Sequence, residues 1–253
     1  MNRGACFLAF TLVLCPALRA DVMASTSIGL TGLTITPDTG TVSFFPGTSA
    51  TAFGAVLDDP LGGSAFDGPN TAFDDVASAN ASTGLASGSA SVSGSGFTAN
   101  AFSSISLSGM NGRADSEANG QLAGIFQILD GGTDTDPVNV AFAATLAANQ
   151  SLLTDAFGIS ATSQVTFQLS IPDFGLILFS NNPLAIGPSD SLSQASTSTV
   201  TNSFQLQFNT PYSIFAEVDS ESSGIDSNPE PSTIILMTTG LAGLLAARRR
   251  RKL

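Results

Sequence analysis

The chain has 253 residues, of which only 11% are charged, and its formal net charge is −12. Between residues 21 and 228 there are 19 acidic residues against one basic residue, Arg113, hence a net charge of −18. So acidic a surface repels phosphate backbones, which excludes nucleic acid as a partner. Both cysteines, Cys6 and Cys15, lie near the start and histidine is absent. The commonest general base and the thiolate metal ligands are therefore missing from the rest of the chain, and we predict that it is not an enzyme.

The first 20 residues have the composition of a secretory signal peptide. Arg3 precedes an apolar run over residues 5–18, and the small residue Ala20 follows shortly after it. A basic start, an apolar core and a small residue at the cut are the parts of such a signal. We predict a signal peptide over 1–20 that engages the secretion machinery and signal peptidase. Cleavage after Ala24 is the alternative to cleavage after Ala20.

Residues 21–222 are predicted to form one β-rich domain outside the cytoplasm. Apolar and polar residues alternate with a period of two in five segments: 33–35, 138–142, 165–171, 204–208 and 214–218. This period is typical of strands with one buried face. The run 176–179 is continuously apolar, so we expect that strand to be covered on both faces. Turn residues separate the segments, which favours an all-β fold, a single jelly-roll-like β-sandwich with little helix.

Two composition biases bear on the packing of this domain. Residues 78–108 are rich in Ala, Ser and Gly, which is typical of either a flexible linker or thin, closely packed strands. Apolar residues such as Val92 and Ile105 recur within this segment, so we favour strands. The chain also has 18 phenylalanines against one tyrosine and no tryptophan. Because a phenylalanine side chain has no polar group, we expect these rings in the core.

The densest acidic loop is a candidate calcium site. Asp130, Asp134 and Asp136 stand at positions one, five and seven of a glycine-containing segment. Carboxylate oxygens are ligands that Ca²⁺ prefers. The loop has Gly132 at position three and no glutamate at position twelve, so it does not match an EF-hand. A solvated turn between two strands is the alternative, and no other cofactor is expected.

The C-terminal segment has the layout of a membrane-sorting signal. A polar linker is predicted over 223–228, and an apolar stretch over 233–247 follows it. As a helix this stretch spans about 22 Å, less than the roughly 30 Å of a bilayer core. The cations after it favour the cytoplasmic side: Arg248, Arg249, Arg250, Arg251 and Lys252. We predict a short transmembrane helix that anchors the domain on the outer side of the inner membrane.

Pro229, Glu230 and Pro231, the short apolar stretch and the basic cluster together resemble the PEP-CTERM sorting signal of Gram-negative bacteria over residues 229–253. The resemblance implies an exosortase-like membrane enzyme that cuts at the tail and passes the protein to the cell surface or the extracellular matrix. It also implies an association with exopolysaccharide and biofilm. We therefore expect a non-enzymatic surface or matrix protein. The alternatives are an adhesin or carbohydrate-binding module, assisted by calcium, and a secreted hydrolase with paired carboxylates.

Overall fold

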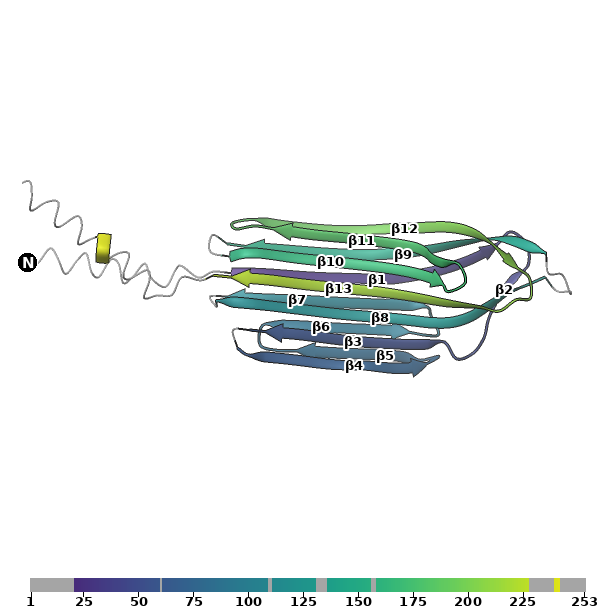
Figure 1. The fold of residues 1–253 in the computed structure, drawn as a ribbon, viewed down its shortest axis with the longest axis horizontal. Helices are drawn as coiled ribbons and strands as arrows, with labels where there is room; N and C mark the ends of the chain where they lie inside the picture. The colour runs from purple at the N-terminus through teal and green to yellow at the C-terminus, as the bar shows by residue number, and fades with distance from the viewer. Residues whose placement is uncertain are drawn as a thin grey trace, which may run out of the picture.

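The computed structural model describes residues 21–59, 61–108, 111–130, 136–155, 158–227 and 239–241. Of these residues, 81% lie in strands and 2% in helix, which confirms the predicted all-β class. The strands form two antiparallel sheets that pack face to face as a β-sandwich (Figure 1). The predicted signal peptide, 1–20, lies outside the described residues.

Sheet A has the strand order β12-β9-β1-β7-β6-β5. Its strands are β1 (Asp21–Pro37), β5 (Val76–Ser82), β6 (Ala86–Ser93), β7 (Thr98–Ser108), β9 (Pro137–Thr154) and β12 (Ser191–Gln207). Three of these strands, β5, β6 and β7, cover most of the Ala-, Ser- and Gly-rich segment 78–108. The prediction that this segment forms strands is therefore confirmed.

Sheet B has the strand order β11-β10-β13-β8-β3-β4, and β2 also pairs with β8. Its strands are β2 (Thr41–Phe44), β3 (Ser49–Asp58), β4 (Gly63–Phe73), β8 (Gly112–Leu129), β10 (Gly158–Ile171), β11 (Gly175–Ile186) and β13 (Tyr212–Asp226). Residues 223–226, predicted to be linker, are part of β13. They stay in the sheet because β13 is paired on both sides, with β8 and β10, as far as Asp226.

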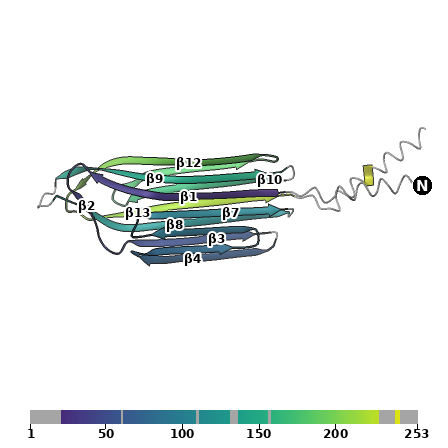
Figure 2. The same ribbon diagram turned by 180° about the vertical axis from the view of Figure 1, so that it is seen from behind.

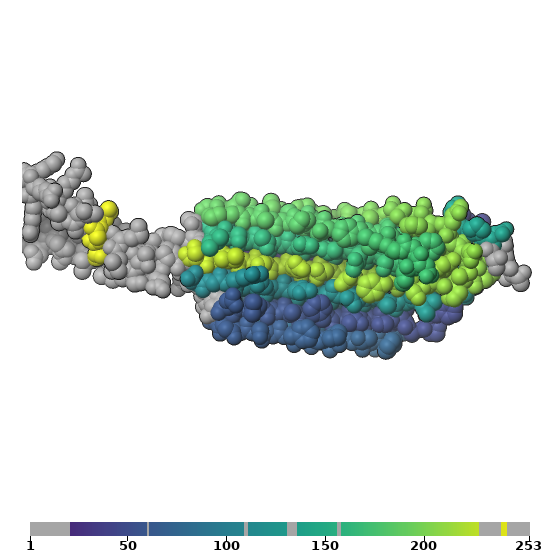
Figure 3. All heavy atoms as spheres, in the orientation of Figure 1, coloured from purple at the N-terminus to yellow at the C-terminus, as the bar shows by residue number. Residues whose placement is uncertain are grey.

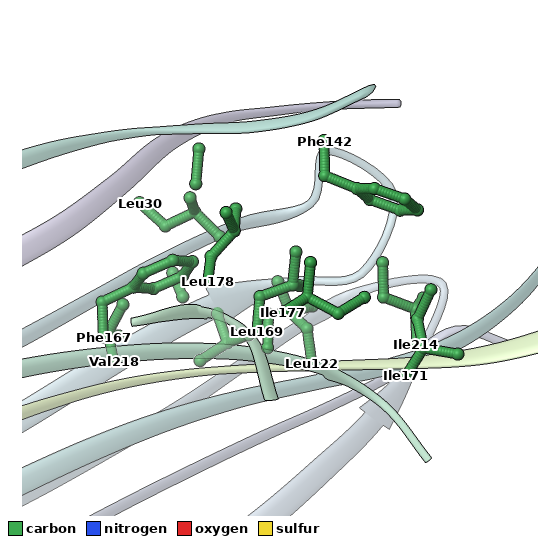
Figure 4. Close-up of a cluster of buried hydrophobic side chains, with 14 of the residues drawn as sticks. Leu30, Leu122, Phe142, Phe167, Leu169, Ile171, Ile177, Leu178, Ile214 and Val218 are labelled. Atoms are coloured by element: carbon green, nitrogen blue, oxygen red, sulfur yellow. The ribbon is translucent and has the colours of Figure 1, made fainter. Parts of the chain in front are cut away.

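The main hydrophobic core lies between the two sheets. The alternation seen in the sequence places Phe167, Leu169 and Ile171 of β10 on the inner face, where each is 0% exposed. They belong to one cluster with Leu122 of β8 and Ile214 of β13, and Figure 4 shows these side chains filling the space between the strands. Full burial of one such side chain contributes about 1.5–3 kcal/mol.

A belt of buried polar side chains crosses the sandwich and separates this core from a second, smaller cluster around Val22 and Leu107. The hydroxyl of Ser103 lies 2.9 Å from the hydroxyls of both Ser220 and Ser222. The belt also contains Thr26, Ser116, Gln150 and Ser163. Buried polar groups are tolerated when they are hydrogen-bonded, and the hydroxyls of Ser103, Ser220 and Ser222 satisfy one another between the two apolar layers. The hydroxyl of Thr26 is the exception in the belt, since it has no partner among the described residues.

Small residues bring the two sheets close together at the level of this belt. A Cβ added to Gly54 of β3 would lie 2.7 Å from the carbonyl oxygen of Gly88 in β6. A Cβ on Gly88 would in turn meet the carbonyl oxygen of Glu117 in β8. The Ala, Ser and Gly content of this half of the sandwich therefore reflects close packing of strands.

Two predictions about apolar residues were wrong. Leu176 and Phe179 of β11 are 54% and 51% exposed, so the run 176–179 is not covered on both faces. The reason is that β11 is the edge strand of sheet B. The phenylalanines are also not all in the core, since seven of those that the structure describes are exposed: Phe44, Phe45, Phe66, Phe73, Phe102, Phe174 and Phe179. Phe66 and Phe73 lie on the opposite edge strand, β4, where one neighbouring strand is missing.

Candidate functional site

The chain enters and leaves the sandwich at the same end. Strand β1 begins and β13 ends on one side of the molecule, as the view from behind shows (Figure 2). The backbone N–H of Asp155 donates to the carbonyl of Asp21 at 3.1 Å. Asp226, the last residue of β13, pairs with Gly158, three residues beyond Asp155. The loops at the far end of the molecule therefore lie farthest from both chain ends.

Three carboxylates gather on the solvent-facing side of sheet B, and we call them the acidic cluster: Glu117 of β8 and Asp219 and Glu221 of β13. The register places Glu117 directly opposite Glu221. One carboxyl oxygen from each residue lies within 4.8 Å of the others. Because side chains alternate along a strand, Asp219 and Glu221 point to the same face.

Glu217, two residues before Asp219, is held by a separate amide network. The side-chain amides of Asn119 and Gln121 donate to its Oε1 at 2.5 and 3.1 Å. Gln168 of β10 donates to its Oε2. In contrast, Oδ1 of Asp219 is buried and has no hydrogen-bond partner in the part of the chain that the structure describes.

The cluster carries uncompensated negative charge. Burial raises the pKa of Asp219 to about 7, and repulsion from Glu221, Glu117 and Glu217 adds to the effect. Burial also raises the pKa of Glu117, again with repulsion from Glu221 and Glu217. Arg113, the one cation among the residues that the structure describes, forms its ion pair with Asp115 at 2.7 Å. The cluster therefore tends to keep a proton near neutral pH.

A shallow depression of about 460 Å³ adjoins the acidic cluster on the outer surface of sheet B. Strands β3, β8 and β13 form it, and its lining includes Leu57, Arg113, Glu117 and Glu221. Three carboxylate oxygens so close together could take up a divalent cation, since Ca²⁺ accepts oxygen ligands at about 2.3–2.6 Å. In its absence a proton can be held by Asp219 or Glu117, whose pKa values are both raised.

The predicted calcium loop lies at the far end of the sandwich, between β8 and β9. Asp130 follows the last residue of β8, and its Oδ1 accepts a hydrogen bond from Asn209 at 3.0 Å. Asp136 directly precedes β9. Asp134 lies outside the described residues, so convergence of these three carboxylates stays a prediction. The structure instead brings Glu117 together with Asp219 and Glu221.

The acidic cluster was missed because its members come from strands far apart in the sequence. One local signal was present, since Glu217, Asp219 and Glu221 are spaced by two and so share one face of a predicted strand. That Glu117 faces them follows only from the pairing of β8 with β13.

The sorting residues Pro229, Glu230 and Pro231 and the basic residues at 248–252 lie outside the described residues. Of the predicted transmembrane helix, 233–247, the structure describes residues 239–241, which are helical. Within the described part of the chain, no helix combines the length and the apolar character needed to cross a membrane.

Comparison with protein families gives a match at the predicted tail. The PEP-CTERM protein-sorting motif matches residues 229–251, which include Glu230 and the first basic residues of the terminal cluster. A comparison with curated proteins finds no match to the chain. The matched residues coincide with the segment whose order of motif, apolar stretch and basic cluster indicated a sorting signal. The chain thus carries a PEP-CTERM protein-sorting motif, which marks it as an exported protein sorted through an exosortase-type pathway.

Proposed function

We propose that this chain is a non-enzymatic surface or extracellular-matrix protein that an exosortase-type enzyme delivers, in association with exopolysaccharide. The sorting motif at 229–251 carries the proposal. The architecture supports it, because the chain enters and leaves the sandwich at the same end, which leaves the long faces and the loops of the far end open to the surroundings. We also relate the fold to jelly rolls, since the chain crosses repeatedly between the sheets, for example from β7 to β8 and from β8 to β9.

The sorting motif starts very close to the folded domain. Strand β13 ends at Asp226, and the matched residues begin at Pro229. Three residues span at most about 10 Å when extended. A processing enzyme that binds the motif therefore lies next to the end of the sandwich where β1 begins. Cleavage at the motif leaves the whole β-sandwich in the released protein.

The test follows two tags in the native host. One tag is inserted in the loop between β8 and β9 at the far end, and the other follows Lys252. We expect the first tag to reach the surface or medium without the second. Glu230→Ala should leave both tags together in the inner membrane. Ser227→Ala, which lies outside the matched residues, is the control and should be processed normally. Intact chains with both tags at the surface would contradict the proposal.

We further propose that signal cleavage follows Ala20 and that the mature chain begins at Asp21. Val22 and Ala24 are 0% and 1% exposed and belong to the smaller hydrophobic cluster. Both residues pair with β7 on one side and with β9 on the other. Cleavage after Ala24 would remove these core residues, so the fold supports the earlier site.

The acidic cluster favours a second candidate function, a calcium-assisted adhesin or carbohydrate-binding module. The observation in its favour is the convergence of oxygens from Glu117, Asp219 and Glu221 within 4.8 Å beside an open depression. If the cluster binds Ca²⁺ in this role, millimolar calcium should raise the melting temperature of the wild type but not that of Asp219→Asn. An equal response of the two proteins would reject the cluster as the calcium site.

A further inference from the structure

Strand β12 forms a long free edge of sheet A. It runs for 17 residues, from Ser191 to Gln207, and among the described strands it pairs with β9 alone. Near its C-terminal end the side chain of Asn202 donates to the carbonyl of Ile177 in β11 at 3.0 Å, so the free part of the edge is its N-terminal part. The register continues from Ser191–Leu153 to Gln207–Pro137 without a shift. Its other side lies along one long margin of the molecule, at the top of Figures 1 and 3. The edge of a sheet presents backbone N–H and C=O groups that can pair with another strand.

The other three sheet edges each have a feature that opposes pairing. The edge strand β4 contains Asp67 and Pro69, and its pairing with β3 is interrupted by a register shift. The edge strand β11 contains Pro183, and a register shift interrupts its pairing with β10. The edge strand β5 is only seven residues long. Proline, charge, irregular register and short length are the devices by which proteins protect edges, and β12 has none of them.

The charge distribution leaves this edge open to a second copy. None of the strands β9, β10, β11 and β12 contains a charged residue. The strand charges of sheet B lie on β3, β4, β8 and β13, whereas β12 is separated from them by neutral strands. Two copies of a chain whose residues 21–228 carry a net charge of −18 would repel each other across most orientations. At β12, in contrast, the two copies would present uncharged strands to each other.

The side chains of β12 are suited to lie opposite a copy of themselves. Residues 191–199 are all exposed, on both faces of the strand, because sheet B does not cover them. Most of them are serine, threonine or glutamine. Pairs of Ser and Thr across neighbouring strands hydrogen-bond and stabilise sheets. A strand at the end of a sandwich with such side chains can continue the sheet without burying an unpaired charge.

We propose that β12 pairs with β12 of a second copy of this chain, antiparallel about a twofold axis, so that the two A sheets become one continuous sheet. The backbone N–H groups of Ser203 and Gln207 already donate to Oδ1 of Asn202 and to the hydroxyl of Tyr212, each at 2.9 Å, so the pairing is confined to residues 191–201. Eleven residues of strand are about 37 Å long, and a sheet with its side chains is about 10 Å thick. The pairing would bury about 700 Å² in total, the size of a weak, reversible interface. The same strand on both partners satisfies the requirement that a twofold interface be self-complementary.

The first test measures the oligomeric state of the full chain in mild detergent by size-exclusion chromatography with light scattering. We expect a dimer in the wild type. Thr197→Lys with Thr199→Lys should raise the apparent dissociation constant by about tenfold or more, because lysines then oppose each other across the axis. The matched control, Ser78→Lys with Ser82→Lys on the edge strand β5, should remain a dimer. Circular dichroism checks that both variants keep their strand content. A monomeric wild type, or equal behaviour of the two double variants, would overturn the proposal.

The second test locates the axis by single cysteines along β12, at each position from 191 to 201, with Cys6 and Cys15 replaced by serine. In an antiparallel pair about a twofold axis, only residues at the axis face their own copy. Residues directly opposite bring Cβ atoms within about 4.5–5.5 Å, near enough for a disulfide after a small adjustment. We expect crosslinking to peak at one position and to decline on either side. Uniform crosslinking along the strand, or none at any position, would contradict the antiparallel arrangement.

Discussion

Replacing Asp219 by asparagine should make the protein more stable at neutral and alkaline pH. Its carboxylate is desolvated and lies beside Glu117 and Glu221, so its pKa in the folded state is about 7 against an ordinary value of 3.8. The folded state therefore binds the proton more tightly than the unfolded state does. Stability is then highest when Asp219 is protonated, falls as the pH rises from about 4 to about 7, and levels off above that.

The size of the effect follows from the two pKa values. The difference between 3.8 and about 7 corresponds to at most about 4 kcal/mol at pH 8. Asp219→Asn removes this penalty while keeping the shape of the side chain. We expect the variant to exceed the wild type by about 1–4 kcal/mol at pH 8 and to match it near pH 3.5.

The assay is urea unfolding of the full chain in mild detergent at a series of pH values, with EDTA present so that no cation neutralises the cluster. Asp67→Asn is a control that should change the stability of the fold in the opposite direction. The backbone N–H of Asn80 and the side chain of Asn70 donate to Asp67 and lower its pKa, so its loss should weaken the fold at pH 7. If Asp219→Asn is as stable as the wild type at pH 8, or less stable, the electrostatic account of the cluster is wrong.

Three further predictions concern packing and processing. Ser103→Ala should lower the free energy of unfolding in urea by about 1–2 kcal/mol, because the buried hydroxyls of Ser220 and Ser222 lose a hydrogen-bond partner. Ala90→Ser is not a suitable control, because it would add a buried hydroxyl. Gly88→Ala should cost about 1–3 kcal/mol by the same measurement, because its Cβ would meet the backbone of β8, and an unchanged midpoint would contradict the close approach of the sheets. Edman degradation or mass spectrometry of the exported protein should find Asp21 at the N-terminus, and a start at residue 25 would refute the proposed cleavage.

The sequence was most informative where one face of a strand is buried. Alternation of apolar and polar residues identified β10 and β13 because their inner faces pack against the opposite sheet. The Ala-, Ser- and Gly-rich segment was correctly assigned to strands, and its small side chains match the close approach of the sheets at Gly54 and Gly88. These features depend on local composition and on a period that the sequence displays directly.

Other features depend on which strands become neighbours, and the sequence does not display that. Residues 223–226 have the composition of a linker, yet pairing with β8 and β10 holds them in the sheet. The exposure of Phe66 and Phe179 follows from the places of β4 and β11 at sheet edges. The acidic cluster needed the register that sets Glu117 opposite Glu221. The free edge at β12 likewise became visible only with the strand order.

Export of this chain and its sorting through the PEP-CTERM motif can be tested on the protein that reaches the cell surface. The most direct measurement is the intact mass of the protein recovered from the surface or medium of the native host. We predict a chain that begins at Asp21, contains the complete sandwich through Asp226 and lacks the apolar stretch 233–247 and the basic residues after it. A surface form whose mass still includes residues 233–253 would contradict processing at the sorting motif and would make the tail a permanent anchor.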